Sequence, residues 1–487
     1  MPSSPLAPWS EDNWREDILR RELSVQATVL AQLANKLGYS EEFPTDTPPL
    51  LCRLFKETAQ IIAKYLPDIP QDHLQIVNTV LCRLAEFLRY AERSKVTQTP
   101  WSMVQATEAF FKLQGGLKCQ FAIRPQWAFN YGIVGEFVEV CRTNIKLLPW
   151  IPLAEWEQGV GKLTDMEIYC VSFPRTHRLN PLSHANWGHE IGHIVAGRWL
   201  AKKFQAIWSE EEPGIKTEIE KDVLANPPPV IDLWKDVAIK ETIAAKITLT
   251  MEVTRQGIEE LLCDAIGVHL MGPAALASAC EFCARYDLDE SPVMRGGHYP
   301  PWRYRLRLMA EACQEDLQEH PPKAGSTKGY PGNMVTPYFK WLTQILNLVA
   351  KNADQEVLKK GVVTREAYKA IEKRWPVIKS EVIAQLPQLS SRPYRLHERI
   401  DIIEELVRKL SADLPPNEVG DWPSVSPASL EDILNAGWAF KLIRARTDAG
   451  WATTENYEKL FRLILKGIES SFVARTFGPR VTKVGTS

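Results

Sequence analysis

The sequence lacks several features that would place it at once among membrane or nucleic-acid proteins. It contains no run of about 20 uncharged apolar residues, which a membrane-spanning helix requires. Its 58 basic residues nearly balance its 60 acidic ones, giving a formal charge of -2, so no overall field draws it to nucleic acid. We therefore expect no nucleic-acid partner and no membrane span.

A disulfide framework and a targeting segment are also missing. The nine cysteines are odd in number and scattered through 487 residues, which is typical of reduced thiols. The first 13 residues have neither the basic nor the apolar segment of a secretory signal. No internal repeat of 20 to 50 residues occurs, so a solenoid is not expected. These features predict a soluble, cytoplasmic protein.

The pattern that is present is predominantly helical. Apolar residues recur every three or four positions in most of the long segments between proline and glycine clusters. The predicted N-terminal helices cover residues 13–37, 51–65, 72–93 and 131–148. Near the other end, Ser429 is placed to cap a helix that continues through Ile443.

Proline and glycine clusters divide the chain into three predicted parts. These are a helical N-terminal region over 1–150, a middle domain over 151–325 and a helical C-terminal region over 326–487. In the middle domain, Glu167 to Phe173 is rich in β-branched and aromatic residues and is the best strand candidate. The expected fold class is mainly α, with an α+β core in the middle domain.

The sequence H-E-I-G-H at residues 189–193 carries the clearest chemical signal. Asn180-Pro181 upstream reads as a helix start, so His189 and His193 should lie one turn apart on one face. Two imidazoles at that spacing can bind one metal ion, and Glu190 can point at a water bound to the same ion. The competing interpretation is two ordinary histidines on a helix.

Two carboxylates in a later apolar helix could complete such a site. Glu260 and Asp264 are spaced i, i+4 within Gly257 to His269. Burying carboxylates is costly unless they are paired or bind a cation. Catalytic zinc normally has three protein ligands and a water, so two histidines leave room for one of these carboxylates.

With these residues, the sequence over about 165–310 resembles the gluzincin metallopeptidases, the thermolysin-like group, in which H-E-x-x-H is followed by a helix bearing E-x-x-x-D. The resemblance implies a zincin-like domain with His189, His193 and Glu260 as ligands of one Zn²⁺ per chain. It also implies Glu190 as general base and Asp264 as the carboxylate that orients His189. Glu259 is a rival to Glu260, but it is five residues from Asp264 and is expected to point away from its face.

The resemblance also assigns the segments before and after these helices. An edge strand ahead of the motif helix would bind extended substrate through Ile168, Cys170 and Ser172, although an ordinary core strand is the alternative.

Downstream, residues 296–305 resemble the His-Pro…Arg segment that supplies oxyanion donors in prenyl-protein peptidases. The candidate donors are His298, Tyr299, Arg303 and Arg305, with His298 favoured. A proline-initiated helix with solvated arginines is the competing interpretation.

The expected function is zinc-dependent hydrolysis of peptide bonds, with a peptide or protein as substrate and the helical flanks as candidate surfaces for protein partners. Two alternatives stay open. One is a non-catalytic interaction protein in which zinc only braces the centre; the presence of Glu190 argues against it, because a structural site needs no base. The other is a zinc amidohydrolase that acts on a non-peptide amide through the same residues.

Overall fold

A computed structural model describes most of the helical parts of the chain. The described residues are 14–43, 47–93, 95, 104, 119–126, 132–134, 167–174, 180–229, 234–284, 288, 299–319, 340, 341, 344, 345, 347, 349, 361–386, 393–420, 424–448 and 450–484. The chain divides into two compact units, Met1–Arg178 and Leu179–Ser487, and each is described by itself.

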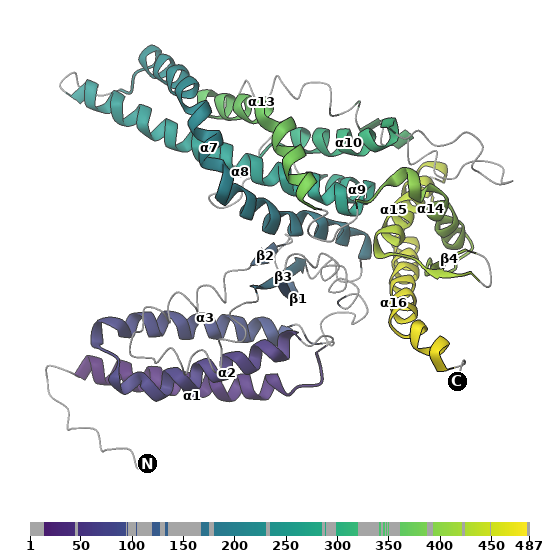
Figure 1. The fold of residues 1–487 in the computed structure, drawn as a ribbon, viewed down its shortest axis with the longest axis horizontal. Helices are drawn as coiled ribbons and strands as arrows, with labels where there is room; N and C mark the ends of the chain where they lie inside the picture. Colours follow the sequence, from purple (N-terminus) through teal and green to yellow (C-terminus); the bar gives the residue numbers. More distant parts are fainter. Residues whose placement is uncertain are drawn as a thin grey trace. The chain divides into compact units, whose positions relative to one another are not determined.

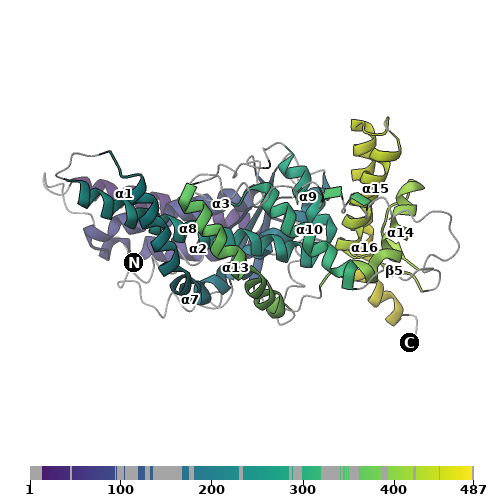
Figure 2. The ribbon, with the colours of Figure 1, turned by 90° about the horizontal axis from the view of Figure 1, so that it is seen from above.

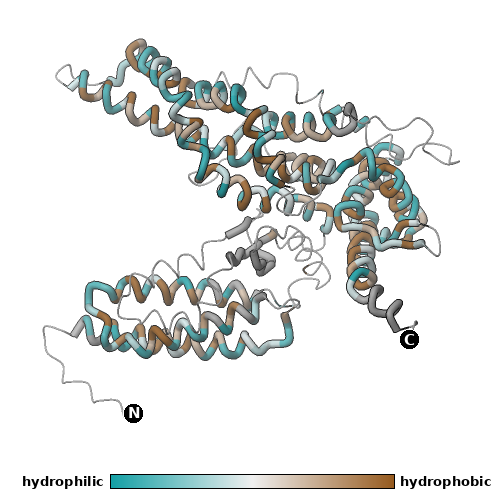
Figure 3. Tube along the Cα trace, in the orientation of Figure 1, coloured by the Kyte–Doolittle hydropathy of each residue, from teal (hydrophilic) through white to brown (hydrophobic). Residues whose placement is uncertain are grey.

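The described part of the first unit includes three long helices, which are labelled in Figure 1. They are α1 (Trp14–Gly38), α2 (Thr47–Tyr65) and α3 (Leu74–Arg93), which confirms three of the four predicted N-terminal helices. Their shared core includes Leu23 and Ile62, both fully buried. The tube coloured by hydropathy shows the apolar residues recurring along these helices between polar ones (Figure 3). The apolar residues that recur at helical spacing in the sequence therefore form the core of a small helical bundle.

A three-stranded sheet belongs to the same unit. Its order is β1 (Cys119–Gln126), β3 (Glu167–Pro174) and β2 (Gly132–Val134), with β1 parallel and β2 antiparallel to β3. The predicted strand at Glu167 to Phe173 is thus confirmed. The predicted helix over 131–148 is wrong at residues 132–134, which form β2, and its other residues lie outside the described part.

The prediction that this strand is an edge strand is also wrong. Cys170 pairs with Ala122 on one side and Val134 on the other, and Ser172 is likewise paired on both sides. Ile168 pairs with Gln120 of β1. Because both neighbours of Cys170 and Ser172 are already strands, their backbone has no free side to which an extended substrate could add.

The second unit is built on a pair of long helices, α7 (Trp187–Ala225) and α8 (Lys235–Met271). They pack against each other along the hairpin seen in Figure 1. A 3-10 helix over Pro181–Asn186 precedes α7, so the helix begins later than the predicted start at Asn180. His189 consequently lies in the first turn of α7, and His193 follows one turn later.

Small residues allow α7 and α8 to approach closely where the two motifs face each other. A Cβ atom on Gly192 would lie 2.5 Å from Cα of Cys263. One turn earlier, a Cβ atom on Gly188 would lie 2.9 Å from Cα of Gly267. No real side chain fits at such distances, so glycine at these positions sets the distance between the two helices.

Further helices cover this pair. They are α9 (Pro273–Cys283), α10 (Trp302–Glu319) and α13 (Gly361–Gln385). Both α10 and α13 pack on α8, and Figure 2 shows α13 beside it. The predicted boundary near 325 therefore separates α13 from the helices on which it packs, and the predicted boundary near 150 also differs from the observed division after Arg178.

Three C-terminal helices complete the second unit. They are α14 (Leu396–Ser411), α15 (Leu430–Thr447) and α16 (Thr454–Val484), with a short ladder of β4 (Glu418–Val419) and β5 (Ser426–Pro427) between α14 and α15. The predicted cap is confirmed, because the Ser429 hydroxyl accepts a hydrogen bond of 3.0 Å from the backbone N–H of Asp432. The described part of the chain is mainly helical, as predicted.

Buried hydrogen bonds connect α15 to the 3-10 helix before α7, to the end of α8 and to the beginning of α9. The side chain of Asn435 donates to the carbonyl of Met271 (2.8 Å) and accepts from the N–H of Ala274 (3.0 Å). The indole of Trp438 donates to the carbonyl of Leu182 (3.0 Å). Each of these buried bonds engages a backbone N–H or carbonyl group.

In the ranges that the structure describes, no helix combines the length and the apolar composition needed to cross a membrane.

We expect Gly192→Ala to destabilise the second unit by about 3 kcal/mol, the upper end of the usual cost of overpacking, because the new methyl group meets backbone atoms of Cys263. The matched control is Gly197→Ala on the same helix, where a Cβ atom meets nothing within 4 Å. Urea unfolding followed by circular dichroism measures both. Equal unfolding midpoints for the two variants would contradict the close helix contact.

Candidate functional site

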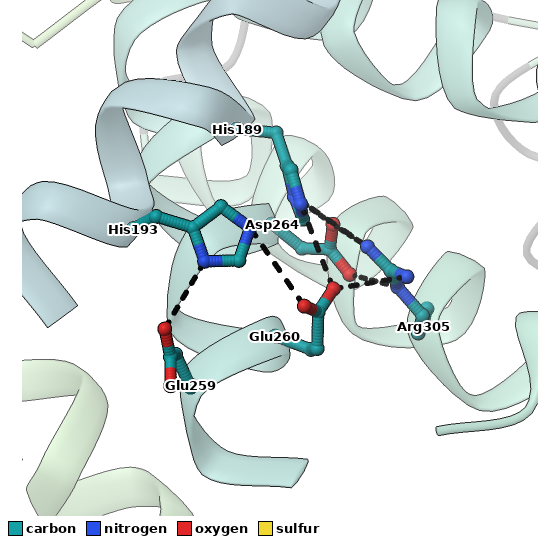
Figure 4. Close-up of polar contacts among 6 residues, drawn as sticks. All are labelled: His189, His193, Glu259, Glu260, Asp264 and Arg305. Carbon is teal, nitrogen blue, oxygen red and sulfur yellow. Dashed lines mark hydrogen bonds and ion pairs between the residues drawn. The ribbon is translucent and has the colours of Figure 1, made fainter. Parts of the chain in front are cut away.

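The two sequence motifs meet at the contact between α7 and α8 (Figure 4). His189 and His193 project from α7 toward Glu260 on α8, and Arg305 reaches the same point from α10. Glu260, Asp264 and Arg305 are buried, with exposures of 6%, 3% and 5%. Residues separated by more than 100 positions in the sequence thus form one polar centre inside the helical unit.

The two histidines present the same nitrogen to Glu260. Nε2 of His189 lies 3.5 Å from Oε2 of Glu260, and Nε2 of His193 lies 3.7 Å from Oε1. Two ligand atoms bound at the usual zinc distances to one tetrahedral ion lie about 3.4 Å apart. The observed separations of 3.5 and 3.7 Å are long for hydrogen bonds. They are close to the distance of about 3.4 Å that separates two ligand atoms of one tetrahedral zinc ion.

The other nitrogen of each histidine is held by a carboxylate. Nδ1 of His189 donates to Oδ1 of Asp264 (2.8 Å), as the resemblance implies. Nδ1 of His193 donates to Oε1 of Glu259 (3.2 Å). A proton held on Nδ1 leaves the lone pair of Nε2 free for a metal ion, which is the usual arrangement behind a ligating histidine.

Glu259 lies on another face of α8 than Asp264, as predicted, and that face contacts His193. The sequence did not predict this contact with a candidate metal ligand. The helical spacing between Glu259 and Asp264 was read correctly, but the position of His193 beside Glu259 is set by the packing of α7 on α8.

Arg305 contacts two carboxylates of the centre. Its Nε and Nη2 donate to the two oxygens of Asp264 at 2.7 and 2.8 Å, and its Nη1 lies 3.2 Å from Oε2 of Glu260. The guanidinium stacks on Trp302, 4.5 Å from the ring centroid. Each of its three nitrogens contacts a carboxylate, so Arg305 positions Asp264 and Glu260.

The charges of the centre are strongly coupled. Burial alone would raise the pKa of Asp264, but the charge and hydrogen bonds of Arg305 hold it well below its usual value. Burial raises the pKa of Glu190, although the neighbouring histidines offset part of the increase. Burial would lower the pKa of His193, but Cys263 and the carboxylates of Glu259 and Glu260 raise it well above its usual value. Without a metal ion, the neighbouring carboxylates thus favour the protonated, positively charged form of His193.

A cysteine that the motif analysis did not consider lies at the same centre. Ligand atoms of His189, His193 and Cys263 all lie within 4.8 Å of one another. Cys263 is fully buried, and burial raises the pKa of its thiol to about 12. The sequence did contain a sign of this proximity: Cys263 follows Glu260 by three residues on the same helix, and residues at that spacing are neighbours on a helix surface.

The residues present fit a metal ion. The two Nε2 atoms face Glu260 at suitable separations, both Nδ1 atoms are held by carboxylates, and a buried sulfur lies within reach. Imidazole, carboxylate and thiolate are the donors that zinc and related transition metals use in proteins. The group of His189, His193 and Cys263 could therefore hold a metal ion, with Glu260 as a further donor.

The remaining candidate residues lie in or near residues 296–305. His298 lies outside the described residues. Tyr299 is half-buried, and burial together with the charge of Glu260 raises the pKa of its phenol, which means that it lies within electrostatic reach of the centre. Arg303 is in the first turn of α10, and its backbone N–H donates to the carbonyl of Leu288 (2.8 Å). Two residues apart on a helix, Arg303 and Arg305 point to different sides.

Comparison of the chain with protein-family models, with curated proteins and with solved structures finds no match in any of the three. The resemblance to gluzincins accordingly depends on the residues of the two motifs and of the segment after them.

We expect Glu259→Ala to lower the affinity for zinc by about 10- to 100-fold. Without the carboxylate, Nδ1 of His193 loses its hydrogen-bond acceptor, and the imidazole ring is no longer held in one orientation. The matched control is Glu252→Ala, which removes an exposed carboxylate from the same helix. Competition with a chromophoric zinc chelator measures both affinities. If the two variants bind zinc equally well, the contact between Glu259 and His193 does not support the metal site.

Proposed function

We propose that the chain is a zinc-dependent hydrolase that cleaves peptide bonds, with a zincin-like centre held by His189, His193 and Glu260. The observation that carries the proposal is the orientation of the two histidines: both Nε2 atoms face Glu260, while both Nδ1 atoms donate to carboxylates. A pair of histidines that served only packing would not need this arrangement. One Zn²⁺ per chain is the proposed cofactor.

When bound, zinc polarises a substrate carbonyl and lowers the pKa of a coordinated water. Glu190 is next to His189 in the first turn of α7 and is buried, with an exposure of 6%. In the proposed reaction its carboxylate takes a proton from the attacking water and passes it to the leaving amine. A carboxylate next to a metal-binding histidine can act as a base in hydrolysis, whereas a purely structural zinc site needs no base.

Charged neighbours keep these groups in place during the reaction. Asp264 holds the Nδ1 proton of His189, and Arg305 fixes Asp264 through two hydrogen bonds. Arg305 also limits the movement of Glu260 through its contact of 3.2 Å with Oε2. Groups that are positioned before the substrate arrives need little rearrangement in the transition state.

The first test compares Glu190→Gln with the wild-type protein. The amide keeps the size of the side chain but cannot act as a base, so zinc content should stay at about one per chain while nearly all hydrolysis is lost. Unbiased cleavage-site profiling on a peptide library measures activity, and mass spectrometry measures zinc. His189→Ala with His193→Ala should lose the zinc itself. Undiminished cleavage by Glu190→Gln would remove the proposal.

The second test concerns the residue that stabilises the negative charge on the carbonyl oxygen. Among the described candidates, Tyr299 lies within electrostatic reach of the centre, whereas Arg305 is engaged with carboxylates. Tyr299→Phe should lower kcat on the order of 100-fold with little change in KM, because the lost hydroxyl would act mainly in the transition state. Arg303→Ala is the control. Wild-type kcat for Tyr299→Phe would assign the donor elsewhere, for instance to His298.

A further inference from the structure

Cys263 occupies a special place in the contact between the two helices. It lies on α8 between Glu260 and Asp264, and its Cα is the atom that a Cβ on Gly192 would meet at 2.5 Å. Its side chain is fully buried. The helix contact that fixes the positions of His189 and His193 thus fixes the position of this thiol as well.

The sulfur lies near a ring nitrogen of each of the two histidines. Ligand atoms of His189, His193 and Cys263 lie within 4.8 Å of one another, and a zinc ion bonds nitrogen at about 2.0–2.1 Å and sulfur at about 2.3 Å. In a tetrahedral site a nitrogen and a sulfur that share one ion lie about 3.6 Å apart, so metal binding requires these side chains to move together by roughly 1 Å at most. A buried thiol beside two imidazoles is the softest donor of the group.

We propose that Cys263 is a protein ligand of the metal ion, so that the resting centre is a closed site with His189, His193, Glu260 and Cys263. Four protein ligands fill the tetrahedral coordination that zinc adopts in structural sites. The thiol gives up its proton when its sulfur bonds to the metal. This inference rests on the metal centre of the proposed function and not on its hydrolytic activity.

The consequence for hydrolysis is that the centre is latent until the sulfur leaves. With a metal ion bound, release of Cys263 would free one position for a water molecule, and the released thiolate would take up a proton from solvent. No electrons are transferred. His189, His193 and Glu260 would then serve both a closed resting site and an open active one.

Cobalt substitution tests the proposal by a spectroscopic signature that depends on sulfur. Wild-type protein loaded with Co²⁺ should show a sulfur-to-cobalt charge-transfer band in the near ultraviolet. Cys263→Ala should lose this band while it keeps its cobalt, and its zinc form should hydrolyse peptides faster than the wild-type protein because the fourth position is open. The matched control, Cys283→Ser, replaces another buried cysteine on the neighbouring helix α9 and should keep the band.

The band in the wild-type protein decides the proposal even if Cys263→Ala does not fold. A band that disappears in the double variant His189→Ala, His193→Ala, and survives Cys283→Ser, shows that a cysteine shares the ion with the histidines. A wild-type protein that holds cobalt through these histidines without a sulfur band overturns the proposal, as does a band that persists in Cys263→Ala.

Failure of this inference can be told apart from failure of the proposed function. Hydrolysis that depends on Glu190 in a protein without the sulfur band would refute Cys263 as a ligand and leave the hydrolase intact. A sulfur band without any Glu190-dependent hydrolysis, even in Cys263→Ala, would support the ligand and indicate that zinc only braces the helices.

Discussion

The close approach of α7 and α8 is the constraint on which the rest of the centre depends. At Gly188 and Gly192 the two backbones are nearer than any side chain would permit. The distance between the helices sets which atoms can meet: the histidine nitrogens and the Glu260 oxygens come to 3.5 and 3.7 Å only because no side chain separates the helices there. The geometry of the polar centre thus depends on the contact between the two helices as much as on the polar residues themselves.

The same contact forces several charged groups out of water. Glu190, Glu260 and Asp264 are each at least nine-tenths buried, and Arg305 neutralises part of their charge. Removing ionised groups from water is expensive, and a single guanidinium cannot compensate three carboxylates. Burial raises the pKa of Glu190, and a protonated His193 or a metal ion would offset part of the remaining negative charge. Metal binding and proton release should accordingly be linked at this centre.

The periodicity of the sequence predicted the helices and strands better than it predicted which of them pack together. The first three N-terminal helices, the strand at Glu167 to Phe173 and the Ser429 cap follow from local patterns, and the meeting of His189 with Asp264 follows from the resemblance. The central position of that strand depends on pairing with β1 and β2, which no local pattern encodes. The contacts of Glu259, Cys263 and Arg305 likewise arise from tertiary packing, where a neighbour is chosen by another helix.

The hydrogen bonds from α15 determine how far the centre can be separated from the rest of the second unit. Asn435 and Trp438 satisfy backbone groups at Met271, Ala274 and Leu182, which stand at the end of α8, the beginning of α9 and just before α7. A fragment that stops at residue 325 would leave these groups buried and unpaired, or exposed to water with their apolar surroundings. Recombinant fragments, domain exchanges and proteolytic trimming that aim to isolate the metal-binding helices must therefore retain the chain through α15.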